Sequence, residues 1–179
     1  MTTLSPIKGK EQIMSIDIIK RILLLTILVL AQVLVLNNIH LLGCATPLLY
    51  VYLVLRINRF YPQWANLLWG FVIGLCVDIF SNTPGLAAAS MTLMSLLQPY
   101  GLNIFVAHDN QDDLKPSFRT LGPVKYISYT SILVFIFCIT FFTLETFNFF
   151  NWLQWIYNIV GSTIITVLLV LVVENVRRD

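Results

Sequence analysis

Apolar stretches of membrane-spanning length recur along most of the chain and are separated by short polar connections. A transmembrane helix needs about 20 mostly apolar residues, because each residue adds ~1.5 Å of rise against a hydrocarbon core of ~30 Å. We expect residues 1–179 to form a single integral membrane domain, because such stretches leave no room for a separate soluble domain. The sequence predicts six spans, at residues 18–36, 41–57, 64–80, 84–106, 125–145 and 152–175.

The composition excludes the main soluble classes of protein. Only 11% of the residues are charged, whereas an ordinary soluble domain has about 25%. The hydrophobic content of 58% excludes a disordered chain, which needs low hydrophobicity and a high net charge. A formal net charge of +2 with no run of basic residues excludes a basic nucleic-acid-binding protein. The predicted fold class is therefore an all-α membrane protein, a bundle of six transmembrane helices.

The basic residues lie in every second connection of this arrangement. All 11 Lys and Arg residues fall on one side of the membrane when six spans are assumed, and the other side has none. Because basic residues concentrate in cytoplasmic loops, we expect both termini to be cytoplasmic and residues 107–123 to form a cytoplasmic loop. The residues concerned are Lys8, Lys10, Lys20, Arg21, Arg56, Arg59, Lys115, Arg119, Lys125, Arg177 and Arg178.

The three cysteines give little sign of special chemistry. Cys44 follows Leu41-Leu42-Gly43, which looks like a lipoprotein cleavage box. A secretory signal, however, is one apolar run that ends at its cleavage site, and polar residues at 37–40 interrupt this run. We therefore expect an uncleaved first helix. Cys76 and Cys138 are distant from Cys44 and no C-x-x-C occurs, so we expect small buried apolar residues rather than disulfides or metal ligands.

Small and polar residues recur at four-residue spacing in the span at 64–80. They are Asn66, Gly70, Gly74 and Asp78, and in a helix they lie along one strip. Gly70 and Gly74 form a G-x-x-x-G pattern, which lets helix backbones approach closely in lipid. Two interpretations remain open: packing against another span of the same chain, and contact with a partner protein.

Asp78 is the only acid that we predict inside a span rather than at its edge or in a loop. An ionisable group within a membrane is a functional candidate, but the helix dipole disfavours a carboxylate near a helix C-terminus. We therefore expect a compensating donor, such as water, the hydroxyl of Ser81 or Thr83, or a loop N–H. The alternatives are a directly functional acid and a structural acid that organises the following turn. In that turn Thr83 is expected to cap the next helix, with Pro84 at its first position.

Polar and small residues also occur within the other spans. Unsatisfied polar groups that face lipid are costly, so we expect these residues to face the interior of the bundle or a cavity. Pro99 is expected to break the hydrogen-bond ladder of its helix, whereas Pro47 lies near the start of its span, where proline is tolerated. The inward-facing residues are predicted to be Gln32, Ala87, Ala88, Ala89, Ser90, Gln154, Asn158, Ser162 and Thr166.

Residues that carry chemistry are sparse. Asp109, Asp112 and Asp113 lie in the long cytoplasmic loop, and clustered carboxylates suit Mg²⁺. No second acidic cluster faces them, so we interpret them as a solvated loop. His40 and His108 are predicted on opposite sides of the membrane, and no motif of a nucleotide-binding protein or zinc hydrolase occurs. We expect no enzymatic activity, no cofactor and no metal.

The arrangement as a whole resembles the family of the bacterial rod-shape-determining protein MreD. The likeness consists of six short spans, a proline that opens the second span in Thr46-Pro47-Leu48-Leu49, and Gly70-x-x-x-Gly74-Leu75-x-x-Asp78 closing the third, followed by Pro84-Gly85. It covers nearly the whole chain. The Gly74-Leu75-x-x-Asp78 element in this topology is its strongest feature.

The resemblance implies a non-enzymatic component of the inner-membrane machinery that elongates rod-shaped cells and makes peptidoglycan. The implied partners are the coiled-coil protein MreC, the actin-like MreB filament, and the synthase pair of RodA with a class B penicillin-binding protein. The helix arrangement of the family is similar to that of the S-components of vitamin transporters, which implies a bundle with an interior pocket open to the outside. The positions that match the family pattern are Pro47, Gly70, Gly74, Asp78 and Gly85.

Three hypotheses follow. The leading one is a membrane scaffold, surrounded by lipid, whose helices bind the transmembrane segment of MreC. The alternative is a substrate-binding S-component with a small molecule in a cavity lined by the spans at 64–80, 84–106 and 152–175. An enzyme acting on a lipid head group ranks last, because Asp78 and the loop acids lie on opposite sides. We take as the candidate helix-packing or partner interface the residues Pro47, Asn66, Gly70, Gly74, Asp78, Gly85, Asn158 and Ser162.

Overall fold

The protein is mainly helical in the part of the chain that its computed structural model describes, with no β-strand in that part. The described residues are 23, 26–30, 32, 46–58, 61–105, 116, 121–146 and 152–176. These residues form the helices α2 (Val51–Leu55), α3 (Gln63–Ser81), α4 (Leu86–Phe105), α6 (Pro123–Thr146) and α7 (Trp152–Val176). The predicted all-α class is confirmed at this level.

The four long helices coincide with four of the predicted spans, and their ends lie within two residues of the predicted ends. α3, α6 and α7 are each long and apolar enough to cross a membrane. α4 has a similar length but more polar side chains. The described part of the chain thus contains three helices of membrane-spanning character, which supports a membrane location.

The second predicted span, at 41–57, is not one continuous helix. Its helical part, α2, has only five residues, which rise about 8 Å and cannot cross a bilayer. Residues 46–48 precede it without helical structure and residues 49–50 form a turn. The apolar composition that predicted a helix reflects burial inside the bundle instead, because Val51 and Tyr52 are both fully buried. Residues 41–45 lie outside the described residues.

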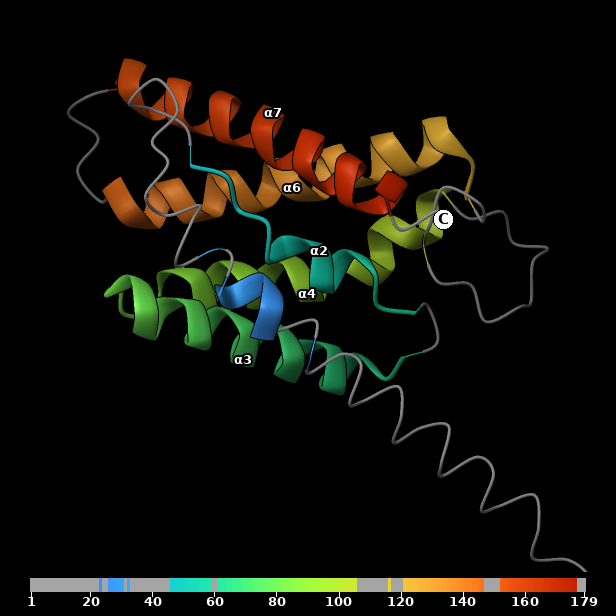
Figure 1. Ribbon diagram of the computed structural model, residues 1–179, viewed down its shortest axis with the longest axis horizontal. Coiled ribbons are helices and arrows are strands. Elements are labelled where there is room, and N and C mark those ends of the chain that lie inside the picture. The colour runs from blue at the N-terminus through green and yellow to red at the C-terminus, as the bar shows by residue number, and fades with distance from the viewer. Residues whose placement is uncertain are drawn as a thin grey trace, which may run out of the picture.

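The helices pack in the order α3, α4, α6 and α7, each against the next. In Figure 1, α3 and α4 lie on one side of the bundle and α6 and α7 on the other, with α2 between them. α2 contacts α3, α4 and α6. The core therefore surrounds a short, centrally placed segment. Its most deeply buried apolar residues include Tyr50, Val51, Val54, Met91, Met94, Tyr129, Val134 and Phe137.

Several predictions concern residues outside the described ranges. The first predicted span, at 18–36, is described only at 23, 26–30 and 32, which are helical. The acidic loop around Asp109, both histidines, Cys44 and most of the basic residues also lie outside. Cys76 and Cys138 are free thiols; Cys138 is fully buried, as expected, whereas Cys76 is only partly buried.

Candidate functional site

The small-residue strip of α3 lies directly against α4. A Cβ atom added to Gly74 would lie 2.5 Å from both the Ala87 carbonyl oxygen and the Ala88 Cα. A Cβ on Gly70 would overlap the Ser95 hydroxyl. The two helices therefore approach more closely than any side chain at these glycines would permit. The strip serves packing within the chain, which is the first of the two interpretations of the G-x-x-x-G pattern.

Asp78 caps the start of α4 from the end of α3. Its Oδ1 accepts a hydrogen bond from the Ala87 N–H and its Oδ2 accepts one from the Ala88 N–H, each at 2.9 Å. The Thr83 hydroxyl donates to Oδ1 at 3.0 Å. These N–H groups belong to the first turn of α4, where the backbone has no intrahelical acceptor and the helix dipole favours a negative charge. The compensating donors are thus the Thr83 hydroxyl, which was among those expected, and two backbone N–H groups of α4 rather than of the loop.

The cap of α4 differs from the one predicted at Thr83. Gly85 stands immediately before the helix with φ +85°, and Pro84 belongs to the turn rather than to the first helical position. An N-cap glycine has no side-chain oxygen, so the first-turn N–H groups need an acceptor from elsewhere. Asp78 supplies it, and Thr83 supports the carboxylate instead of capping the helix.

α4 continues through Pro99, contrary to the predicted break. Proline has no N–H to donate to the carbonyl four residues earlier, which is that of Ser95. The Asn66 side-chain amide donates to this carbonyl oxygen at 2.9 Å. A side chain of α3 therefore replaces the hydrogen bond that the proline omits, and the helix is maintained.

The same asparagine begins a chain of hydrogen bonds that reaches α2. Asn66 Nδ2 also donates to Gln98 Oε1 at 3.1 Å, and Gln98 Nε2 donates to the Ile57 carbonyl at 3.0 Å. The Tyr129 hydroxyl of α6 donates to the Leu55 carbonyl at 3.2 Å. The last carbonyls of a helix have no intrahelical donor. Side chains of α4 and α6 thus complete the end of α2.

The non-helical stretch before α2 is held by side chains from other helices. The Thr46 N–H donates to Ser162 Oγ, and the Leu48 N–H donates to Thr166 Oγ1, each at 3.1 Å. Gln32 donates to the Pro47 carbonyl at 2.7 Å and accepts from the Leu49 N–H at 2.9 Å. Pro47 has no N–H that needs a partner. These bonds satisfy backbone groups that would otherwise be orphaned in an apolar interior.

This stretch follows the axis of α7. Its successive partners on α7 are Ser162 and Thr166, and the Tyr52 hydroxyl then reaches Glu174 at 2.6 Å. The twelve residues from 162 to 174 rise about 18 Å along a helix, and residues 46–52 contact α7 over this length, the last contact being made by the long side chain of Tyr52. The chain therefore runs beside α7 for more than half of a typical hydrocarbon core of ~30 Å.

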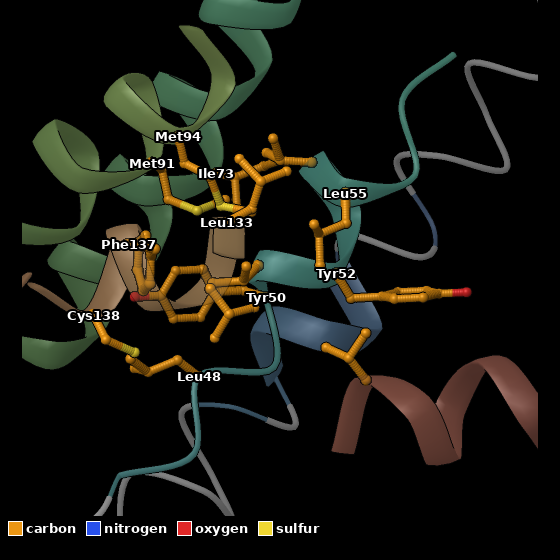
Figure 2. Packing of buried hydrophobic residues seen from close by; sticks show 14 of the residues in the cluster. Leu48, Tyr50, Tyr52, Leu55, Ile73, Met91, Met94, Leu133, Phe137 and Cys138 are labelled. Carbon is orange, nitrogen blue, oxygen red and sulfur yellow. The ribbon is translucent and has the colours of Figure 1, made fainter. Parts of the chain in front are cut away.

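Tyr50 and Tyr52 project from the two sides of the same segment, as Figure 2 shows. The Tyr50 ring lies 5.8 Å from that of Phe137, edge to face, and points toward Cys138. Tyr50 is fully buried, and its hydroxyl has no hydrogen-bond partner among the described residues. Such an orphaned hydroxyl is costly in a low-dielectric interior.

The structure brings most of the predicted site residues into the bundle but not into one place. Asn66, Gly70, Gly74 and Asp78 form the seam between α3 and α4, and Gly85 begins α4 at the end of that seam. Pro47 and Ser162 belong to the separate contact between the non-helical stretch and α7. Asn158 is half-buried one turn before Ser162.

Two of the residues expected to face inward do not. Ala89 is exposed, because it lies on the side of α4 that faces away from the bundle, although Ala88 and Ser90 next to it are buried. Gln154 is exposed in the first turn of α7. The residues Gln32, Ala87, Ala88, Ser90, Ser162 and Thr166 are buried as predicted.

Sequence reasoning missed Gln98, Tyr52 and Glu174 as members of polar contacts. Glu174 lies in the last turn of α7, yet it is only 7% exposed. The available signal was its spacing, because Ser162, Thr166 and Glu174 lie four and eight residues apart on one face of α7.

The described residues offer little for metal or acid–base chemistry. No group of three His, Cys, Asp or Glu side chains in this part of the chain is placed to hold a metal ion. Asp78 has both carboxylate oxygens bound to backbone N–H groups and is 4% exposed. What the arrangement does is join helices and fix a non-helical segment inside the bundle.

The chain matches no protein-family model, and neither curated proteins nor solved structures include one that is significantly similar to it.

Proposed function

We propose that this chain is a non-enzymatic scaffold of the bacterial inner membrane, within the machinery that elongates the cell and makes peptidoglycan. It crosses the membrane six times as an S-component-like bundle, with both termini in the cytoplasm. It binds MreC, and it links MreC to the MreB filament and to RodA with its class B penicillin-binding protein. The proposal extends the resemblance carried by Thr46-Pro47-Leu48-Leu49 and by the Gly70–Asp78 element.

The observation that best supports the proposal is that polar side chains within the helices form hydrogen bonds to the backbone of the same chain. Asp78 binds the first N–H groups of α4, Asn66 replaces a missing proline N–H, and Gln32 holds the stretch before α2. A catalytic carboxylate needs access to a substrate, whereas these groups are committed to the backbone of their own chain. Such a framework supports a role in which shape and surface, not reactive groups, matter.

The contact with a partner helix must use another surface than the small-residue strip, because that strip is covered by α4. Large apolar side chains are exposed on several helices, including Leu68 of α3 and Leu168 of α7, each 57% exposed. In a membrane these faces meet lipid or a neighbouring helix. We place the MreC contact on one of these outward faces.

Site-specific photo-crosslinking tests this contact. A benzophenone amino acid is introduced singly at Leu68 or Leu168, and at the fully buried Val134 as the matched control. We expect a covalent adduct with MreC from at least one outward position and none from Val134. If no outward position of α3, α4, α6 or α7 gives an MreC adduct in cells that contain both proteins, the proposed contact is wrong.

The cellular role has a separate test. Depletion of the chain from a rod-shaped host should produce rounded cells, because elongation would lose a membrane component. An unchanged rod shape after complete depletion would contradict a role in elongation.

One observation favours the alternative function, a substrate-binding S-component. The fully buried Tyr50 hydroxyl has no partner among the described residues, and it points toward Cys138 in the interior of the bundle. A polar small molecule could supply the missing hydrogen bond. Mass spectrometry of extracts from the purified protein distinguishes the two functions. A small molecule that is bound stoichiometrically, and whose binding is lost in Tyr50→Phe, would support the S-component. Bound lipid alone would support the scaffold.

A further inference from the structure

Four polar side chains meet at the end of the bundle where α2 ends, α6 begins and α7 ends. Tyr52 belongs to α2 and Arg56 is its C-cap, Tyr126 lies in the first turn of α6, and Glu174 lies in the last turn of α7. The Tyr52 hydroxyl donates to Glu174 Oε2 at 2.6 Å. Tyr126 interacts electrostatically with Glu174, Tyr52 and Arg56. We call these four residues the inner polar cluster.

The inner polar cluster contains opposite charges that do not neutralise each other directly. Glu174 is only 7% exposed. The Nε atom of Arg56 is buried and has no hydrogen-bond partner among the described residues. Within the described residues no ion pair joins Arg56 to Glu174. Buried charges need a partner of opposite sign with good geometry. In the described part of the chain, no cationic group is therefore paired with Glu174 and no anionic group with Arg56.

We propose that the inner polar cluster binds the head group of an aminophospholipid of the phosphatidylethanolamine type. A primary ammonium has three N–H donors, which the carboxylate of Glu174 can accept. A guanidinium such as that of Arg56 pairs strongly with phosphate. Both charged parts of the head group would thus find a partner, and each would complete a group that the protein leaves incomplete.

Two features favour this lipid over other sources of phosphate. The cluster holds one basic and one acidic residue, whereas sites for anionic lipids are basic. Large apolar side chains lie exposed beside it, which suits acyl chains and gives no advantage to a soluble ligand. They are Val124 and Ile127 of α6 and Val172 and Val176 of α7.

The first experiment uses the wild-type protein, purified in detergent, and measures bound lipid by native mass spectrometry. The probes are palmitoyl-oleoyl phosphatidylethanolamine, its mono- and dimethyl derivatives, phosphatidylcholine and phosphatidylglycerol. We expect occupancy to fall with each methyl group, and phosphatidylcholine to bind roughly tenfold more weakly, because its quaternary ammonium donates no hydrogen bond. Phosphatidylglycerol should also bind weakly, since it brings no cation to Glu174. Equal binding of all five lipids would overturn the proposal.

Variants assign the two halves of the site. Glu174→Gln should remove the preference for phosphatidylethanolamine over phosphatidylcholine, whereas Arg56→Gln should weaken both lipids alike. Lys125→Gln is the matched control, because Lys125 is an exposed basic residue at the start of the same helix as Tyr126. An undiminished preference in Glu174→Gln would contradict the assignment. If that variant does not fold, the methylation series with the wild-type protein still decides.

A competition arm separates the lipid from a soluble ligand of the same chemistry. Phosphoethanolamine has the same ammonium and phosphate but no acyl chain. We expect it not to displace the lipid at equal concentration, and displacement there would overturn the assignment to lipid. These measurements use the purified chain alone, so their failure is distinct from a failure to bind MreC.

Discussion

A recurrent device at the scale of single residues is a side chain that takes over a backbone hydrogen bond. The Asp78 carboxylate completes the first turn of α4, and the Asn66 amide occupies the place of the N–H that Pro99 lacks. Asp78 and Asn66 both belong to α3, so each hydrogen bond that they make to the backbone of α4 also joins the two helices. In an apolar interior an unpaired backbone group is costly, so these residues act on stability through their neighbours.

Substitutions of Asp78 should show a graded loss of stability. Asp78→Ala leaves the Ala87 and Ala88 N–H groups without their acceptor, and we expect a cost of about 1–2 kcal/mol, as for a lost N-cap. Asp78→Asn keeps one acceptor oxygen and should cost roughly half as much. Thermal unfolding in detergent measures both. Equal stability of Asp78→Ala and the wild type would show that the cap is not needed.

A double-mutant cycle tests the role of Asn66. Asn66→Leu should orphan the Ser95 carbonyl, whereas Pro99→Ala restores the N–H that this carbonyl lacks. We therefore expect Asn66→Leu to cost about 1 kcal/mol less in the Pro99→Ala background than in the wild type. The loss of the bond to Gln98 cancels in the cycle, because it occurs in both backgrounds. If the changes in the free energy of unfolding of the two single variants simply add in the double variant, the Asn66 amide does not replace the N–H that Pro99 lacks.

At the scale of elements, two kinds of contact organise the bundle. The α3–α4 hairpin depends on close backbone approach at Gly70 and Gly74. The non-helical stretch before α2 depends on side-chain hydrogen bonds from α7 and Gln32. The stability of the hairpin depends on packing, whereas that of the stretch depends on hydrogen bonds. Different substitutions should therefore weaken the two contacts.

The hairpin should tolerate a side chain at one glycine and not at another. Gly74→Ala forces α4 away from α3, because its Cβ would lie 2.5 Å from backbone atoms of α4. Gly101→Ala is the matched control, since its Cβ would lie 3.7 Å from Leu133, an ordinary contact. We expect Gly74→Ala to lower the melting temperature and Gly101→Ala to preserve or raise it, because alanine favours helix by about 1 kcal/mol.

A larger side chain at Gly74 extends this comparison. Gly74→Leu should reduce the amount of assembled protein more than Asp78→Asn, which keeps hydrogen-bonding capacity. The reverse order, measured as monodisperse protein after detergent extraction, would show that the close approach of α3 and α4 matters less than the cap.

The non-helical stretch gives a matched pair of threonines. Thr166→Val removes the acceptor of the Leu48 N–H, whereas Thr140→Val removes only a bond within its own helix, from Thr140 Oγ1 to the Ile136 carbonyl at 2.9 Å. We expect Thr166→Val to cost about 1 kcal/mol, and Thr140→Val to be nearly neutral. Equal effects on the unfolding midpoint would mean that the stretch does not depend on α7.

The contrast between elements also explains what sequence reasoning achieves here. Apolar length located α3, α4, α6 and α7 because a continuous helix satisfies its own backbone. It did not predict the non-helical stretch at 46–50, where apolar residues are buried around backbone groups that side chains of other helices satisfy. Pro47 and Pro99 have the same chemistry, yet only the stretch after Pro47 is non-helical, because Asn66 is placed to support α4. Such compensation depends on distant residues and cannot be seen locally.

At the scale of the whole molecule, the arrangement of charge sets the proposed topology. The loop between α3 and α4 has no Lys or Arg, whereas Arg56 and Arg59 follow α2, Arg119 precedes α6 and Lys125 lies in its first turn. Because basic loops stay in the cytoplasm, the Asp78 end of the hairpin faces outward and the inner polar cluster faces inward in this account.

Cysteine labelling in spheroplasts tests this topology. In a variant without the native cysteines, Pro84→Cys should react with an impermeant maleimide from outside, and Lys125→Cys only after the membrane is permeabilised. Both positions are exposed at opposite ends of the bundle. Labelling of Lys125→Cys in sealed spheroplasts would mean that the orientation is inverted or the spans are miscounted.

Co-purification of MreC with a tagged copy of this chain, after mild detergent extraction of the native membrane, tests the scaffold function most directly. The account predicts that MreC is retained by the wild type and is lost from Gly74→Leu, whose helix hairpin is disrupted. Recovery of folded, monodisperse wild-type protein without MreC would contradict it.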